Sequence, residues 1–578
     1  GRDRKDIVPC PLARKRRMTY FCVEKKYIKQ VYMKKFWITL AACFGLASTA
    51  EVMACTGLLV GKKASVDGSV MISYAADSYT LYGELYRWPA AVWPEGAMLD
   101  ITEWDTGKPL GQIPQVRQTY SVVGNMNEHQ VAITESTFGG RPELVDTTGI
   151  MDYGSLIYVA LQRSKSAREA IQVMTDLVAK YGYYSGGESF SIADKNEAWI
   201  MEMVGKGTGN KGAVWVAIRI PDDCIAAHAN QSRIQQIPFD DKENCLYSPD
   251  VVSFAREKGY FSGKDEDFSF AKAYCPYDFS ALRICEARVW SFFNKYNKDM
   301  GKYLGFAKGD VNAEPMPLYI KPDRKLSVAD VRDMMRDHYE GTELDMTNDP
   351  GAGPYKAPYR FRPLTYKVDG ETYTNERPIS TQQSGFVIVP QLRSWLPDAI
   401  GGVLWFAVDD ANTTVFTPIY CSSTDVPECY RQGNGSMMQF SWTSAFWIRN
   451  WVANMVYGRY NQMIGDLRKV QSELENGYLD MQPAIDKAAS ELYQKDPKEA
   501  AKFLTWYSTT TADESVDRWK KLGEFLIVKY SDGVARKEKD GKFLDNGYGL
   551  GAAPDSPGYS EDFYRAIVKS AGERLKVK

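Results

Sequence analysis

One cysteine follows a segment that a cell is expected to remove. Met33-Lys34-Lys35 gives a basic start, an apolar stretch runs from Phe36 to Ala47, and small residues end in Val52-Met53-Ala54. This order is typical of a secretory signal with its cleavage site. Cleavage after Ala54 would make Cys55 the N-terminal residue. Its thiol and α-amine would then supply a nucleophile and a base on one residue, at the start of the first strand.

The chain upstream of Met33 does not read like a protein domain. Residues 1–32 do not begin with Met and hold ten Lys or Arg against three Asp or Glu. We predict that translation starts at Met33; the alternative is an unusually long, basic start of the signal. Residues 33–54 are then the signal, and we favour direct cleavage after Ala54. The alternative is cleavage after Ala50, followed by self-cleavage of the four remaining residues.

Charge and hydropathy limit the partners of the mature chain. The 578-residue chain has a net charge of −2, and without residues 1–54 it keeps 59 Lys and Arg against 69 Asp and Glu, a net charge of −10. Such an acidic chain lacks the excess positive charge that attracts nucleic acid or an anionic membrane. No later apolar run reaches the roughly 20 residues that span a bilayer. We expect an exported bacterial protein, periplasmic or extracellular, without stable membrane insertion; a homo-oligomer is left open.

Cysteine and histidine usage gives no metal signal. Cys421 and Cys429 are spaced to close a short disulfide loop, and the alternative is that all the cysteines other than Cys55 are reduced. There is no CxxC pair, and the three histidines are far apart in the sequence: His129, His228 and His338. We therefore predict no metal and no other cofactor.

The order of elements predicts an α+β fold. Strand-like runs dominate the first half, and helical periodicity dominates after residue 443. We predict a catalytic domain over residues 55–440 and a mostly helical extension over 441–578. The expected elements are strands at Thr56–Val60 and Ser69–Ser73 around a turn at Asp67-Gly68, helices over Tyr153–Tyr181 broken near Lys165-Ser166, a hairpin over Phe190–Met203, helices at Phe279–Tyr296 and Val328–Arg336, an ordered loop at 345–378, strands at Gly385–Val389 and Val403–Val408, and one long helix at Thr443–Leu474.

A series of motifs resembles one known family. The opening Cys-Thr-Gly-Leu-Leu-Val-Gly-Lys-Lys-Ala-Ser-Val-Asp-Gly-Ser at residues 55–69 is similar to the start of the mature dipeptidase A-like cysteine peptidases. These belong to the N-terminal nucleophile hydrolases, with the bile-salt and penicillin V acylases as relatives. Further similar stretches follow in order: Met126-Asn127-Glu128, Glu135-Ser136-Thr137, Arg336 to Thr342, Arg377 to Ser380 and Ile400 to Phe406.

The resemblance implies a fold and an activity. The fold is a four-layer αββα core, here with a helical C-terminal extension. The activity is hydrolysis of peptide bonds in dipeptides or short peptides through a thioester on Cys55. Two other functions stay open: an amidase or acylase acting on non-peptide amides, and a lipid-anchored binding protein in which Cys55 is only an attachment point.

The resemblance also implies partners for the nucleophile. Asp77 matches the Asp that binds the amine of the nucleophile, but Tyr74 stands where the acylases carry Arg. Asn230 matches an Asn of the oxyanion hole. Arg288 matches a late Arg near the nucleophile. A second oxyanion donor falls at Ser136 or Thr137, and the sequence does not decide between them. The structural alternatives are a turn cap for Asp77, a loop residue for Asn230 and a surface or ion-paired arginine for Arg288.

Overall fold

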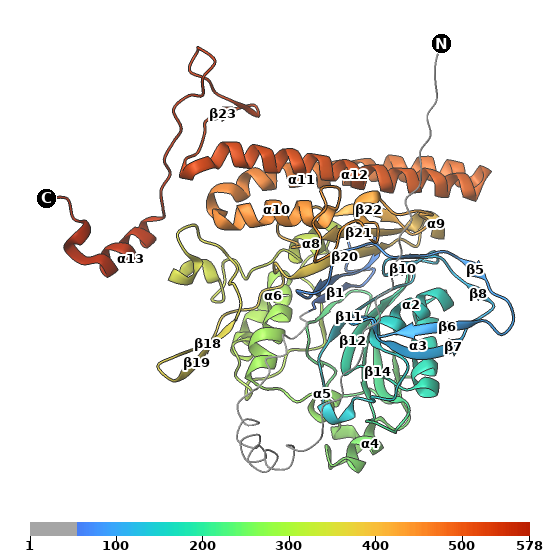
Figure 1. The fold of residues 1–578 in the computed structure, drawn as a ribbon. Helices are drawn as coiled ribbons and strands as arrows, with labels where there is room; N and C mark the ends of the chain where they lie inside the picture. The colour runs from blue at the N-terminus through green and yellow to red at the C-terminus, as the bar shows by residue number, and fades with distance from the viewer. Residues whose placement is uncertain (1–54) are drawn as a thin grey trace, which may run out of the picture. The chain divides into compact units, whose positions relative to one another are not determined.

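Two eight-stranded antiparallel sheets form the centre of residues 55–578, the part of the chain that this computed structural model describes (Figure 1). The predicted signal at residues 33–54 lies outside the described residues. The first sheet has the order β17-β15-β1-β2-β20-β21-β22, with β3 paired to β20, and the second has the order β16-β14-β13-β12-β11-β10-β9-β4. The α+β class is therefore confirmed.

The strand bounds fix which residues meet at the sheet ends. The first sheet contains β1 (Gly57–Val60), β2 (Val70–Ile72), β3 (Tyr74–Asp77), β15 (Ile225–His228), β17 (Tyr319–Ile320), β20 (Ser384–Leu392), β21 (Gly402–Val408) and β22 (Thr417–Tyr420). The second contains β4 (Arg87–Trp88), β9 (Val122–Val123), β10 (Met126–Asn127), β11 (Ala132–Thr137), β12 (Gly187–Ala193), β13 (Ala198–Gly205), β14 (Ala213–Ile220) and β16 (Cys245–Tyr247).

Apolar side chains fill the space between the two sheets. Leu59 and Phe386 of the first sheet share one buried cluster with Ile200 and Val214 of the second. Successive residues of a strand point to opposite faces. The next residue along β1, Val60, accordingly belongs to a different cluster, on the outer face of the first sheet.

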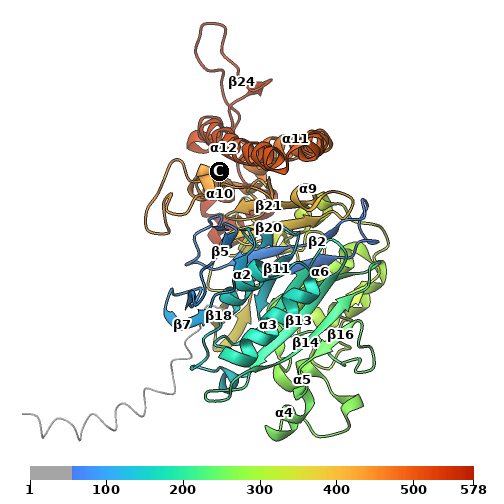
Figure 2. The ribbon, with the colours of Figure 1, turned by 90° about the vertical axis from the view of Figure 1, so that its right-hand side faces the viewer.

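Helices cover the outer faces and complete the four layers. On the second sheet, α2 (Tyr153–Arg163) and α3 (Ala167–Tyr181) pack over strand residues such as Ile133 (Figure 2). On the first sheet, α6 (Ala287–Tyr296) and α8 (Val328–Met334) share a buried cluster with β1, β20 and β21. The predicted break between the helices of 153–181 is confirmed, because the side chain of Ser166 caps α3.

Close packing explains the glycine of the opening motif. Strand β1 lies between β15 and β2, and its register pairs Gly57 with His228. A Cβ on Gly57 would lie only 2.7 Å from the imidazole of His228, so a larger residue cannot keep this register. The predicted turn before β2 is also present. Asp67 Oδ1 accepts hydrogen bonds from the backbone and hydroxyl of Ser69 at 3.0 and 2.6 Å, and Gly68 has a φ of +84°.

The C-terminal region is helical, but the single helix predicted over Thr443–Leu474 is wrong. The chain forms α10 (Ala445–Gly458) and α11 (Tyr460–Lys495), separated at Arg459, whose φ and ψ are −144° and 51°. The guanidinium of Arg459 donates to Tyr530 O at 2.7 Å, at the end of α12 (Pro497–Tyr530). This long-range contact accompanies the break, and the helical periodicity of the sequence carries no sign of it.

Helix α12 covers the edge of the first sheet. It runs beside α11 in both views (Figures 1 and 2), and Ser508 Oγ accepts the N–H of Tyr420 in the edge strand β22 at 3.1 Å. An edge strand otherwise exposes such N–H groups to solvent or to another chain. The boundary at 440/441 between core and extension stays a prediction.

Three further predictions differ from the structure. The helix predicted from Phe279 is a π-helical segment, η3 (Ala281–Glu286), that continues into α6. The loop at 345–378 contains a hairpin of β18 (Thr365–Val368) and β19 (Glu371–Thr374). Within residues 55–578 every cysteine is unpaired, so the suggested disulfide between Cys421 and Cys429 is wrong. Instead the Cys421 thiol donates to Asp398 O at 3.1 Å.

Residues 55–578 show neither a membrane-spanning helix nor a cluster of metal-ligating side chains. Across residues 55–578, no helix combines the length and apolar character needed to cross a membrane. The same residues contain no group of three or more His, Cys, Asp or Glu arranged to hold a metal ion.

Candidate active site

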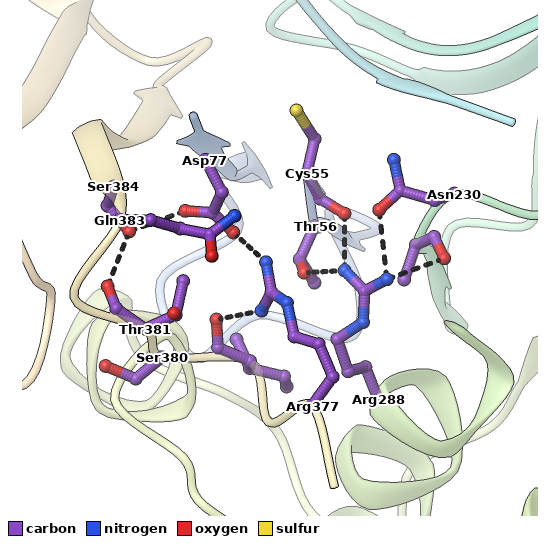
Figure 3. Close-up of polar contacts among 12 residues, drawn as sticks. Cys55, Thr56, Asp77, Asn230, Arg288, Arg377, Ser380, Thr381, Gln383 and Ser384 are labelled. Carbon is purple, nitrogen blue, oxygen red and sulfur yellow. Dashed lines mark hydrogen bonds and ion pairs between the residues drawn. The ribbon is translucent and has the colours of Figure 1, made fainter. Parts of the chain in front are cut away.

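Cys55 lies directly before β1 and is held there through its backbone. Its neighbour Thr56 pairs with Ala75 of β3, donating to Ala75 O at 3.3 Å and accepting from Ala75 N–H at 3.0 Å. The carbonyl oxygen of Cys55 accepts a hydrogen bond from Arg288 at 2.6 Å (Figure 3). The side chain of Cys55 is fully buried. The position of the sulfur therefore depends on both the strand pairing and Arg288.

Arg288 uses all its donors to hold backbone and side-chain oxygens. A guanidinium has five N–H donors, and those of Arg288 make five hydrogen bonds, of 2.6 to 3.1 Å. The acceptors are Cys55 O, Thr56 Oγ1, Ala229 O, Asn230 Oδ1 and Ile284 O. The last lies in the π-helical segment η3, a type of segment that is frequent at functional sites. Arg288 positions the nucleophile through its carbonyl oxygen.

Asn230 lies beside Cys55 in a constrained conformation. Its φ is +60°, in the left-handed region that Asn tolerates better than most residues. Arg288 donates to Oδ1 at 2.9 Å, which fixes the amide orientation, and Nδ2 donates to Thr137 O at 2.6 Å. In Figure 3, Nδ2 and the sulfur of Cys55 point to the same side. The amide nitrogen and the thiol thus face the same side of the site.

Asp77 is buried at the end of β3 and is held from two sides. Arg377 forms an ion pair with Oδ2, and the hydroxyl of Ser384 donates to Oδ1 at 2.5 Å (Figure 3). Burial raises the pKa of Asp77, and the charge of Arg377 opposes this shift. We call Asp77, Asn230, Arg288 and Arg377 the arginine side of the site.

A carboxyl group and a phenol also lie beside the sulfur. Cys55 Sγ lies 3.6 Å from Glu135 Oε1 and 3.8 Å from the hydroxyl of Tyr74, and that hydroxyl donates to the same Glu135 oxygen. Tyr74 therefore takes a position beside the thiol, although it replaces the Arg of the acylases. At this place a phenol and a carboxyl group lie beside the sulfur.

A second buried carboxyl group completes this side. Glu188 of β12 faces Thr137 across the ladder, and Glu135 lies two residues before Thr137 on the same face. Thr137 Oγ1 donates to Glu188 Oε1 at 3.0 Å. We call Tyr74, Glu135 and Glu188 the carboxyl side of the site.

The two carboxyl groups interact directly. Burial raises the pKa of Glu135 to about 7, and burial together with the charge of Glu135 raises that of Glu188 well above its usual range. A charge on Glu135 therefore favours the protonated form of Glu188. The pair therefore holds its protons more tightly than two exposed carboxyl groups would, and Glu135 ionises near neutral pH.

The environment of Cys55 keeps its thiol protonated. Burial raises the pKa of the thiol well above its usual range, and the charges of Glu135 and Asp77 raise it further. Hydrogen bonds with the backbone of Asp77 and with the side chain of Tyr74 oppose the shift. Since the thiolate is the reactive form, attack from this sulfur requires a base that removes its proton.

Ser136 and Thr137 have their side chains engaged elsewhere. Ser136 Oγ pairs with His228 Nδ1 at 2.6 Å and accepts the N–H of Asn230 at 3.2 Å. The other ring nitrogen of His228 pairs with Ser191 Oγ at 2.7 Å. Burial, together with the charges of two arginines, lowers the pKa of His228 to about 3, so the ring stays neutral. His228 thus anchors β11 and β12 to β15.

A pocket with aromatic walls adjoins Tyr74. It is partly open to solvent. Its walls include stacked or edge-on pairs such as Trp88 with Tyr158, at 5.1 Å between ring centroids. The lining residues are Tyr74, Tyr86, Trp88, Trp104, Gly124, Asn125, Tyr153, Gly154, Ile157, Tyr158 and Phe386. Because Tyr74 contacts both this pocket and the sulfur, the pocket is a candidate binding place for a substrate next to Cys55.

The structure brings all the residues singled out from the sequence around Cys55, and adds others. Asp77, Asn230, Arg288 and Tyr74 surround the sulfur and its carbonyl, while Ser136 and Thr137 contact Asn230. Sequence reasoning missed Glu135, Glu188, Arg377, Ser384 and His228 as parts of the site. Two of these, Glu135 and Arg377, stand inside the quoted family-like stretches, which was the available signal.

Comparison with known proteins identifies the class of this chain as a peptidase. The model of peptidase family C69 matches residues 54–87 and 85–473, which is most of the chain. The chain therefore belongs to peptidase family C69.

Curated relatives agree with this family. A protein named "Probable dipeptidase" from Latilactobacillus sakei is 28% identical over 448 residues, covering 73% of this chain and 86% of the relative. Another of that name from Salmonella dublin is 28% identical over 417 residues, covering 67% and 85%. "Dipeptidase A" from Lactobacillus helveticus is 25% identical over 449 residues, covering 73% and 84%. The predicted resemblance to dipeptidase A-like peptidases is confirmed.

Proposed function

We propose that this protein is an exported dipeptidase that uses Cys55 as an N-terminal nucleophile. The observation that carries the proposal is the position of Cys55: it follows the predicted cleavage site, and its sulfur lies among Tyr74, Glu135 and Asp77 at the start of β1. Membership of peptidase family C69 and the names of the relatives support peptide substrates of two residues. Export to the periplasm or the medium rests on the signal-like segment at residues 33–54.

The first chemical step forms a thioester. The α-amine of Cys55, with an ordinary pKa of about 7.7–8.0, removes the proton of the thiol. The sulfur attacks the carbonyl carbon of the scissile bond, and the carbonyl oxygen becomes an oxyanion. The C–N bond then breaks, and the ammonium of Cys55 gives its proton to the leaving amine. Because burial keeps the thiol protonated, a base this close to it is required.

Asn230 is the side chain that we assign to the oxyanion. Its amide points to the same side as the sulfur, and Arg288 fixes its orientation (Figure 3). A preorganised donor of this kind stabilises the transition state by about 2.7–4 kcal/mol. Arg288 acts as a positioning residue, because its donors are already used.

The second step releases the product. The α-amine of Cys55 takes a proton from water, and the resulting hydroxide attacks the thioester carbon. The C–S bond breaks, the thiolate recovers the proton from the ammonium, and the acid product leaves. The same two groups of Cys55 therefore serve in both steps.

The decisive test combines a mass measurement with a substrate screen. The intact mass and N-terminal sequence of protein from its natural host should correspond to an unmodified chain that starts at Cys55. That chain should hydrolyse dipeptides, and Cys55→Ala should lose at least about 10⁴-fold in kcat, as for other covalent nucleophiles. A chain that starts upstream of Cys55, or one with lipid on Cys55, would refute the amine-assisted mechanism. Hydrolysis of acylated amines in preference to dipeptides would favour the acylase alternative.

A further inference from the structure

Glu135 and Glu188 contain buried oxygens that receive no hydrogen bond from residues 55–578. Glu135 is fully buried and Glu188 is 1% exposed. Each uses its Oε1: Glu135 Oε1 accepts from Tyr74, and Glu188 Oε1 accepts from Thr137. Each Oε2 has no donor within the described chain.

Such a pair is costly unless a cation approaches it. A buried carboxylate loses its hydration, and the loss is recovered only by hydrogen bonds or an opposite charge. No arginine or lysine of residues 55–578 forms an ion pair with Glu135 or Glu188. Arg288 and Arg377 are used on the arginine side, where they hold Cys55 and Asp77. The carboxyl side therefore suits a cation supplied by a ligand.

The geometry of a dipeptide places a cation there. From standard bond lengths, the α-nitrogen of an amino acid lies about 2.5 Å from its own carbonyl carbon. A reacting sulfur approaches that carbon to about 3–3.5 Å. The α-ammonium of the first residue of a dipeptide is therefore close to the sulfur during attack. Glu135 Oε1 lies 3.6 Å from Cys55 Sγ, and so it is close to the place that this ammonium would occupy.

We propose that the Glu135–Glu188 pair binds the free α-ammonium of the substrate's first residue, and so restricts the enzyme to substrates with an unblocked N-terminus. This inference rests on the proposed function, because it uses Cys55 as the nucleophile. The charges match, since an ammonium meets two buried carboxyl groups that have no ion-pair partner among residues 55–578. The aromatic rings of Tyr74 and Tyr153, which line the adjoining pocket, offer faces that also favour an ammonium group.

An ammonium-binding pair would distinguish peptidase substrates from acylase substrates. The acyl group of an acylated amine has no ammonium next to the scissile carbonyl, so the carboxyl pair would gain nothing from it. A dipeptide carries one at that place. The pair is thus a specificity-determining feature, and it separates the two substrate classes by charge.

Binding without turnover gives the cleanest test. We would use the mature protein with Cys55→Ala and compare Ala-Phe with propionyl-Phe, which lacks only the amine, by calorimetry. We expect Ala-Phe to bind at least about 10-fold more tightly. Adding Glu135→Gln should remove most of that difference, and Glu188→Gln should reduce it. Glu143→Gln, at an exposed position that contacts Tyr260, should leave it unchanged.

The outcomes separate this subsite from the proposed function. Equal binding of the two ligands, or an equal loss for both with Glu135→Gln, would overturn the proposal; the second result would indicate that the pair serves the amine of the protein itself. If dipeptides are hydrolysed but the amine gives no advantage, the subsite is wrong and the function stands. If the amine gives its advantage but no dipeptide is hydrolysed, the function is wrong and the subsite stands.

Discussion

The two sides of Cys55 differ in how they use their polar atoms. On the arginine side, all five N–H donors of Arg288 form hydrogen bonds. Arg377 and Ser384 hold Asp77 there. On the carboxyl side, Glu135 and Glu188 each keep an oxygen without a donor from residues 55–578. Arg288, whose donors are all used, positions the nucleophile, and a side with unsatisfied carboxyl oxygens is suited to receive a substrate. Replacements on the two sides should therefore have different signatures.

Loss of Arg288 should have the largest effect on stability. Arg288→Met leaves several buried acceptors without a donor, among them Cys55 O and Asn230 Oδ1. Each unsatisfied acceptor costs about 1–3 kcal/mol, so we expect a loss of at least about 3 kcal/mol in urea unfolding and little dipeptide hydrolysis. Arg324→Met removes an exposed ion pair with Asp330 and should cost less than about 1 kcal/mol. Similar losses for both variants would contradict a saturated arginine side.

Loss of the Asn230 side chain should affect turnover. Asn230→Ala removes the amide that we assign to the oxyanion, and kcat for dipeptides should fall about 10²–10³-fold with little change in KM. The measurement is steady-state hydrolysis, with Asn244→Ala, in a polar turn outside the site, as the control. A rise in KM at unchanged kcat would instead place Asn230 in substrate binding.

Glu135 should make stability depend on pH. Its pKa is about 7 in the folded protein and near 4.5 when exposed, so the folded state binds the proton more tightly. Stability should therefore fall as pH rises from about 4.5 to 7 and level off above. Glu135→Gln cannot ionise, and its stability relative to the wild type should rise by roughly 1–3 kcal/mol between pH 5 and pH 8. Urea unfolding at both pH values measures this, and a pH-independent difference would contradict the buried charge.

Ser384 should have the smallest effect. Ser384→Ala removes one donor to Asp77, but Arg377 still pairs with that carboxylate. We expect a loss of about 1–2 kcal/mol in thermal unfolding and only a few-fold change in kcat/KM. A loss of activity as large as that of Asn230→Ala would show that Asp77 depends on Ser384 more than on Arg377.

Local sequence patterns predicted those parts of the site and fold that lie close to recognisable motifs. Cys55, the strands around it and the break between α2 and α3 follow from short-range signals. Arg377 could not be assigned, because it meets Asp77 across 300 positions of the chain. Glu188 depends on the register of β11 against β12, and a shift of one residue would turn it to the other face.

The π-helical segment η3 places a limit on chain length rather than on residue type. Arg288 follows this segment directly, and its guanidinium is aimed by the phase of the helix on which it stands. Each residue advances a helix by about 100°. Deleting one residue of Ala281–Glu286 would leave every side chain named in the site intact and still swing Arg288 away from the carbonyl of Cys55. An insertion in the exposed β18–β19 hairpin would not change the direction of Arg288. The number of residues between two points of this chain is therefore as much a part of its active site as the residues themselves.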